Sequence, residues 1–148
     1  MAAAWVLPVN AERLLLVDDK GGTEVRATRL QPFDVYLIAE RDSLPEISAV
    51  AYTLEVPAGI VVVGEELLVD SLLGLGSSQA GMNLVFRCAT GPRVRVLRFR
   101  CVATRPMDAA ALRLMPDRRT QFLGIVSCRD EDFAKFDAAP TQFTVNAR

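Results

Sequence analysis

The sequence predicts an all-β protein, a single antiparallel β-sandwich of about eight to nine strands. Three observations predict this fold. Apolar and polar residues alternate with a period of two, β-branched residues cluster in short runs, and turn residues recur roughly every ten positions. A β-barrel would show the same pattern, so the barrel remains an alternative at this point.

The chain length and composition predict one domain. The chain has 148 residues, of which 51% are hydrophobic and 24% charged. A chain of this length can bury a hydrophobic core without needing disulfides or metal ions for stability. Repeats, low-complexity tracts and linkers are absent from the sequence. We therefore expect one domain over 1–148, with 1–10 as a possible N-terminal arm.

The first half of the chain predicts successive strands. Residues 12–18 lead into a DDKGG turn, whose glycines can adopt positive φ, and 23–30 and 32–41 follow. In 46–56 the side chains alternate strictly, which is typical of a half-buried strand. The turn Pro57–Gly59 then leads into the β-branched run Ile60–Val63.

Two later stretches are ambiguous. Residues 67–81 contain leucines at helical spacing, but glycines and a Ser-Ser pair interrupt any long helix, so we expect a loop with at most one helical turn. Residues 107–117 are rich in alanine but short, and we interpret them as a strand. Residues 122–128 and 142–147 supply the last predicted strands.

The stretch 83–103 predicts a hairpin around a turn at 90–93. Leu84, Phe86 and Cys88 would share its inner face with Leu97, Phe99 and Cys101. Val94 and Val96 are out of phase with the residues that follow them, and this predicts a β-bulge near Val96–Leu97.

The three cysteines allow at most one disulfide within the chain. In the predicted hairpin Cys88 lies opposite residue 95, which leaves Cys101 roughly 20 Å away along the strand. A disulfide needs Cα atoms within about 7 Å, so these two are not partners. Any bridge therefore includes Cys128, and Cys88 and Cys101 are equally available to it. Three reduced, buried thiols are the alternative.

Charge is segregated along the chain although the net charge is only −1. Residues 1–86 sum to −7, residues 87–119 to +7 and residues 120–148 to −1. We expect outward charges of neighbouring strands to pair across this division. The arginines expected on one outward basic face are Arg87, Arg95, Arg98 and Arg100. Because that face lacks the aromatic residues on which bases stack, we do not expect nucleic-acid binding.

Several functional classes are excluded by residue types that are missing from the sequence. Histidine is absent, which removes Ser-His-Asp hydrolases and histidine-containing zinc sites. The cysteines show no CxxC spacing, and no segment is long and apolar enough to insert into a membrane. The opening lacks a basic region and a signal-peptide core, which is typical of a cytosolic start or of a mature sequence with an initiator Met.

Acidic groups give weak indications of chemistry. The pairs Asp18–Asp19 and Glu65–Glu66 resemble solvated turns rather than the paired carboxylates of a glycosidase. Asp130 and Asp132 alternate so that both could face one calcium ion, although the sequence shows no complete ligand set and a plain acidic loop is the interpretation we prefer. We therefore expect no metal site, no cofactor and no enzymatic activity.

Six segments carry a resemblance to a known family: Val35–Leu37, Ala51–Gly59, Leu84–Cys88, Leu97–Pro106, Cys128–Asp130 and Gln142–Asn146. Through these segments most of residues 10–147 resemble secreted bacterial β-sandwich domains of immunoglobulin-like or cohesin-like type. The resemblance implies that Cys88 and Cys128 are half-cystines and that Cys101 is an additional, unpaired cysteine.

The fold and the resemblance together favour a non-catalytic binding or structural module located outside the cell or on its surface. A self-assembling structural subunit, such as part of a surface filament or a virion decoration protein, is the alternative. Both hypotheses imply a protein partner or self-association, and the sequence leaves open whether the chain binds a small molecule.

Overall fold

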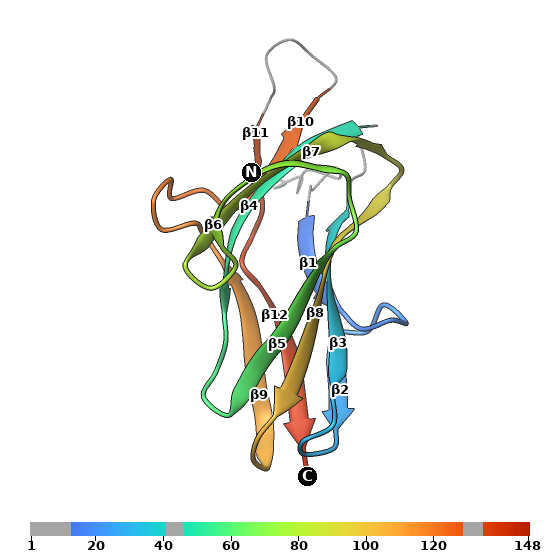
Figure 1. Cartoon of the computed structure of the whole chain (residues 1–148), viewed down its shortest axis with the longest axis vertical. Coiled ribbons are helices and arrows are strands. Elements are labelled where there is room, and N and C mark those ends of the chain that lie inside the picture. Colours follow the sequence, from blue (N-terminus) through green and yellow to red (C-terminus); the bar gives the residue numbers. More distant parts are fainter. Residues whose placement is uncertain (1–12, 41–45, 129–134) are drawn as a thin grey trace, which may run out of the picture.

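The protein is a sandwich of two β-sheets (Figure 1). The computed structural model describes residues 13–40, 46–128 and 135–148, and these residues form strands and turns without a helix. None of them could therefore cross a membrane as a helix. Both sheets have open edges, so the predicted sandwich is confirmed and the barrel alternative is wrong.

The smaller sheet has four antiparallel strands. Their order is β1 (Arg13–Val17), β3 (Phe33–Glu40), β8 (Arg93–Ala103) and β5 (Ile60–Leu67). β8 contributes Val96, Leu97, Phe99 and Cys101 to the core, and all four are buried.

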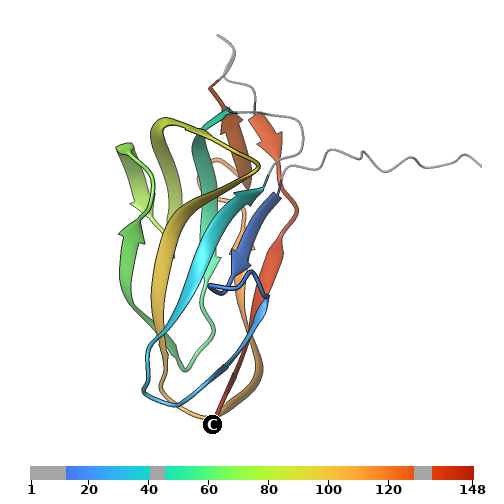
Figure 2. The ribbon, with the colours of Figure 1, turned by 90° about the vertical axis from the view of Figure 1, so that its right-hand side faces the viewer.

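The larger sheet contains eight strands. Its main path runs through β11 (Lys135–Asp137), β10 (Gly124–Ser127), β4 (Glu46–Glu55), β9 (Met107–Met115), β12 (Thr141–Ala147) and β2 (Glu24–Ala27). β7 (Gly81–Thr90) pairs with β4, and β6 (Ser71–Ser77) pairs with β7. All pairings are antiparallel except that of β12 with β2, which is parallel. Figure 2 shows β5 and β6, both green, along the same side of the molecule.

The core lies between the two sheets. Its largest fully buried side chains are aromatic, with Phe99 from the smaller sheet and Tyr52, Phe86 and Phe143 from the larger one. Burial of such side chains is the main source of stability for a sandwich of this size.

The predicted bulge in β8 is confirmed. Leu37 pairs with Leu97 and the next residue, Ile38, pairs with Arg95, so Val96 is the extra residue. This insertion explains why Val94 and Val96 can be buried together with Leu97, although a regular strand would alternate them.

The predicted hairpin is wrong. β7 and β8 follow each other in the chain, but β7 belongs to the larger sheet and β8 to the smaller one. Both strands turn one apolar face to the same core, whether they pair in one sheet or face each other from two sheets. The alternation of apolar and polar residues is the same in the two cases, so it does not show which one occurs.

Two further expectations need correction. Residues 71–77 form strand β6 rather than a loop, because hydrogen bonding to β7 overrides the low strand propensity of Gly74 and Gly76. With β6 and the short β11, the described residues form twelve strands, more than the eight or nine expected. The expected arm 1–10 lies outside the described residues.

Candidate functional site

Two rows of paired residues cross the outer face of the larger sheet on β6, β7, β4 and β10. In the first row Leu73 pairs with Val85, Val85 with Ala49, and Ala49 with Val126. Residues that pair directly across strands share one face, so these four side chains lie together. The second row consists of Leu75, Asn83, Ala51 and Gly124.

A groove of about 540 Å³ follows these rows over β7, β4 and β10. The small side chains of Ala49 and Ala51 leave space between Val85 on one strand and Val126 on another, and Phe122 lines the same space. We call the groove that these five residues line the outer groove. Apolar side chains dominate it, and among its described lining residues Lys135 is the single ionisable one.

The loop 116–123 borders the outer groove and is organised around Asp117, whose side chain is fully buried. Asp117 Oδ2 accepts hydrogen bonds from Asn83 Nδ2 at 2.8 Å, from Thr120 Oγ1 at 2.8 Å and from the Thr120 backbone N–H at 3.3 Å. Arg119 Nε lies 3.8 Å from Asp117 Oδ1. Burial by itself would raise the pKa of Asp117, but the hydrogen bonds outweigh it and lower the pKa below 3.8.

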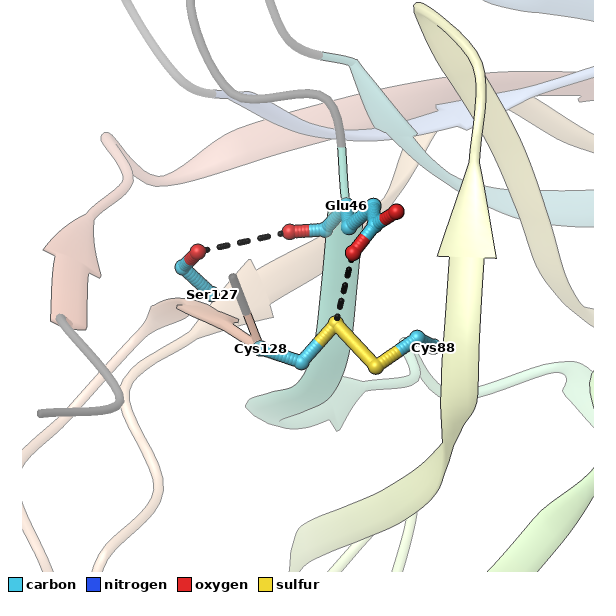
Figure 3. The surroundings of a disulfide bond; sticks show 4 residues. All are labelled: Glu46, Cys88, Ser127 and Cys128. Atoms are coloured by element: carbon cyan, nitrogen blue, oxygen red, sulfur yellow. Dashed lines mark hydrogen bonds between the residues drawn. A yellow bond between two sulfur atoms is a disulfide. The ribbon is translucent and has the colours of Figure 1, made fainter. Parts of the chain in front are cut away.

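A disulfide joins Cys88 of β7 to Cys128, which follows β10, with their Cα atoms 6.1 Å apart (Figure 3). β4 lies between these two strands, and its first residue, Glu46, faces the bridge with Cys128 Sγ 3.9 Å from Glu46 Oε2. The bridge therefore fixes the two strands that flank the floor of the outer groove.

The position of Cys88 differs from the expectation that it faces the core. Ile47 pairs with Ala89 while Ala49 pairs with Val85, so β7 contains two extra residues in this stretch. This irregularity turns Cys88 outward, where it is exposed and can reach Cys128. The ligand atoms of Glu46, Cys88 and Cys128 lie close together, but the two sulfur atoms are joined in the disulfide and only reduction to thiolates would allow the three residues to bind a metal ion.

Cys101 is the free thiol of the described residues, and it is buried. Burial raises the pKa of Cys101 to about 12, and the nearby carboxylates of Asp34 and Glu65 act in the same direction. At neutral pH the thiol is therefore protonated, and it is shielded from reagents as well.

This arrangement predicts a specific pattern of alkylation at pH 8. Protein purified without reductant should take up no iodoacetamide when folded and one equivalent, at Cys101, in concentrated guanidinium chloride. Prior reduction should raise the uptake in guanidinium chloride to three equivalents, as intact-mass measurement would show. Three equivalents without reduction would contradict the Cys88–Cys128 bridge.

The four predicted basic-face arginines lie on strands of two different sheets. Arg87 lies on β7 of the larger sheet, where its Nε is 3.7 Å from Asp70 Oδ2, and the other three lie on β8 of the smaller sheet. The expectation of a single stripe fails because it assumed that β7 and β8 pair.

Acidic and aromatic neighbours engage the other three predicted arginines, Arg95, Arg98 and Arg100 of β8. Arg98 forms an ion pair with Glu66 of β5, and Arg100 Nε lies 3.3 Å from Asp34 Oδ1 of β3. The guanidinium carbon of Arg95 lies 4.6 Å from the centre of the Tyr36 ring. The first half of the chain thus supplies the neutralising charges, as the charge segregation predicts, and each exposed pair contributes about 0–1 kcal/mol.

The other acidic groups do not form a catalytic pair among the described residues. Asp18 Oδ1 accepts hydrogen bonds from the backbone N–H groups of Lys20 and Gly22, at 2.9 and 2.7 Å, and so stabilises a turn as expected. Glu65 and Glu66 lie on β5 rather than in a turn. Asp130 and Asp132, the possible calcium ligands, lie outside the described residues.

The outer groove was not predicted from the sequence. Its signal was present in the strand 46–56, where Ala49 and Ala51 occupy positions that would carry polar residues if that face were simply solvated. Val85 and Val126 are apolar residues at outward positions of the neighbouring strands.

The two-sheet arrangement with these pairings is a cohesin-like β-sandwich. A cohesin module from a family 33 glycoside hydrolase of Clostridium perfringens superposes with a TM-score of 0.62 at 11% identity, over 95% of this chain and 100% of that module. The seventh ScaB type I cohesin of Pseudobacteroides cellulosolvens gives 0.63 at 10% identity, over 93% and 92%.

A non-cellulosomal cohesin from the archaeon Archaeoglobus fulgidus is similar as well, with a TM-score of 0.55 at 11% identity over 93% of this chain and 91% of that one. No family model matches the sequence, and no curated protein is similar to it. At these identities the comparisons establish the fold.

Proposed function

We propose that this chain is a non-catalytic protein-binding module whose binding site is the outer groove. The observation that carries the proposal is the apolar groove that runs across β7, β4 and β10, with Ala51 buried at its floor, Val85 exposed, and Val126 and Phe122 half-buried. Exposed apolar patches of this kind are typical of protein-binding sites. The groove lacks the paired acid and base that hydrolytic catalysis requires, as far as its described lining residues extend.

A solved complex of a similar module supports a protein partner. CaCohA2 of Clostridium acetobutylicum, in complex with CaDoc0917, superposes on this chain with a TM-score of 0.62 at 13% identity, over 93% of this chain and 100% of that one. We propose by analogy of fold that this chain also binds a protein.

We further propose that the module works outside the cell or on its surface. The Cys88–Cys128 disulfide supports this location, because such bridges persist in oxidising compartments. The alternative of a self-assembling structural subunit is supported by a separate observation, the open edge of β6.

A peptide-display selection tests the outer groove. Dodecapeptides selected from a random phage library on the immobilised chain should lose at least tenfold in affinity when Val126→Glu places a carboxylate in the groove. Folding should tolerate this change, because Lys135 pairs directly with residue 126 and can neutralise the new charge.

Val61→Glu is the matched control, since Val61 is an exposed valine on β5 of the other sheet. It should change the affinity of the same peptides by less than twofold. Peptides that bind Val126→Glu as well as the unmodified chain, or a selection that enriches no peptide, would contradict the proposal.

A further inference from the structure

β6 is an open edge strand whose apolar side chains are exposed. Among the described strands it pairs only with β7, and all seven of its residues are exposed. Its leucines 72, 73 and 75 are exposed by 60%, 51% and 52%. An edge of this kind presents unpaired backbone N–H and C=O groups beside apolar side chains, and it is therefore a template for another strand.

β6 lacks the charges that protect the other edges. Proteins commonly place charged residues on open edge strands to prevent pairing with another chain. Charged residues occur on every other strand that ends a sheet in the described part of the chain: Arg13 on β1, Glu24 and Arg26 on β2, Glu65 and Glu66 on β5, and Lys135 and Asp137 on β11. From Ser71 to Phe86 the sequence carries no charge at all.

The β6 edge is also held in place before any partner arrives. An Arg119 Nη donates to the backbone oxygens of Leu75, at 3.0 Å, and Gly81, at 3.2 Å, and so ties β6 to the start of β7. The turn after β6 is anchored to β4, because the buried Tyr52 hydroxyl lies 2.8 Å from Ser78 Oγ. Little ordering is then needed on binding, which favours affinity.

We propose that the β6 edge pairs with the β6 edge of a second copy of this chain, antiparallel and about a twofold axis at Gly74. In this register Leu73 lies opposite Leu75 of the partner subunit, and Leu72 lies opposite Gly76 of the partner subunit. The irregular stretch of β6 between Ser71 and Leu73 ends this regular register near Leu72. Leucines therefore meet leucines or glycines, no charge is buried, and the pattern is self-complementary as a twofold interface requires.

The self-complementary pattern is the reason to choose a second copy over a foreign strand. The same five residues, 72–76, supply both sides of a matched register, whereas nothing on the edge selects a charged or specifically shaped peptide. A twofold pairing also closes on itself, so it yields a dimer instead of a fibre. The two larger sheets become one sheet in the dimer, with both outer grooves on the same face.

Cysteine cross-linking tests the register. Gly74 lacks a positive φ, and a Cβ added there would contact Leu84 Cδ1 at 3.8 Å, so Gly74→Cys fits the fold. Position 74 lies on the axis, and mild oxidation should give a covalent dimer of Gly74→Cys. The control Ser71→Cys should not cross-link, because its two copies would be about 20 Å apart.

Light scattering with size exclusion tests the dimer itself. The unmodified chain should show a concentration-dependent dimer, and Leu73→Lys should raise its dissociation constant at least tenfold. Val126→Glu should leave it unchanged, so that a failure of the dimer and a failure of the proposed groove are distinguishable. A monomer at all concentrations would overturn the inference, and so would cross-linking of Ser71→Cys that is as efficient as that of Gly74→Cys. If the monomer binds a selected peptide at its β6 edge, the edge pairs with a foreign strand and not with a second copy.

Discussion

Replacing Cys88 and Cys128 together by serine is expected to lower the free energy of unfolding by about 3–4 kcal/mol. The two cysteines are 40 residues apart in sequence, so the disulfide closes a loop that contains β8, β9 and β10. Such a cross-link stabilises the fold chiefly by reducing the conformational entropy of the unfolded chain. Urea unfolding followed by circular dichroism would measure the difference.

The control for this variant is Cys101→Ala, which removes the buried free thiol. This change deletes one buried sulfur atom and should cost about 1 kcal/mol. Reductant should destabilise the unmodified chain and Cys101→Ala but have no effect on the double serine variant. A double serine variant as stable as the unmodified chain under oxidising conditions would contradict the structural role of the bridge.

The fold class was predictable because period-two alternation is a local property of each strand. Leu37, Tyr52 and Phe99 are buried as their alternation indicates, and even the bulge at Val96 left a visible change of phase. The partners of each strand were not predictable in the same way. β7 and β8 have the alternation of a hairpin, and only tertiary packing places them in different sheets.

The candidate sites were predicted less well than the fold. β6 was missed because all its residues are exposed and two of them are glycines, so it has neither a buried face nor a strong strand propensity. The pairing of Cys88 with Cys128 followed from the family resemblance and not from the spacing. Its geometry depends on the irregular stretch of β7 that turns Cys88 outward.

Asp117→Ala is the second change with a large expected effect. It should lower the free energy of unfolding by about 3 kcal/mol, because the donors of Asn83 and Thr120 lose their acceptor inside the protein. The exposed Asp137→Ala is the control and should change the stability by less than about 0.5 kcal/mol. Equal stability of the two variants in urea unfolding would contradict the role assigned to Asp117.

The effect of Asp117 should depend on pH with a definite sign. The folded state lowers the pKa of Asp117 below 3.8, so the carboxylate contributes its full stabilisation above pH 4 and loses it as the pH falls through the folded-state pKa. The isosteric variant Asp117→Asn should therefore be less stable than the unmodified chain at pH 7, and the difference should shrink in acid. The loop 116–123 carries Phe122 into the outer groove, so Asp117→Asn should also lower the affinity of groove-binding peptides at neutral pH. If the variant is measurably destabilised but its peptide affinity is unchanged, the loop does not contribute to the binding site.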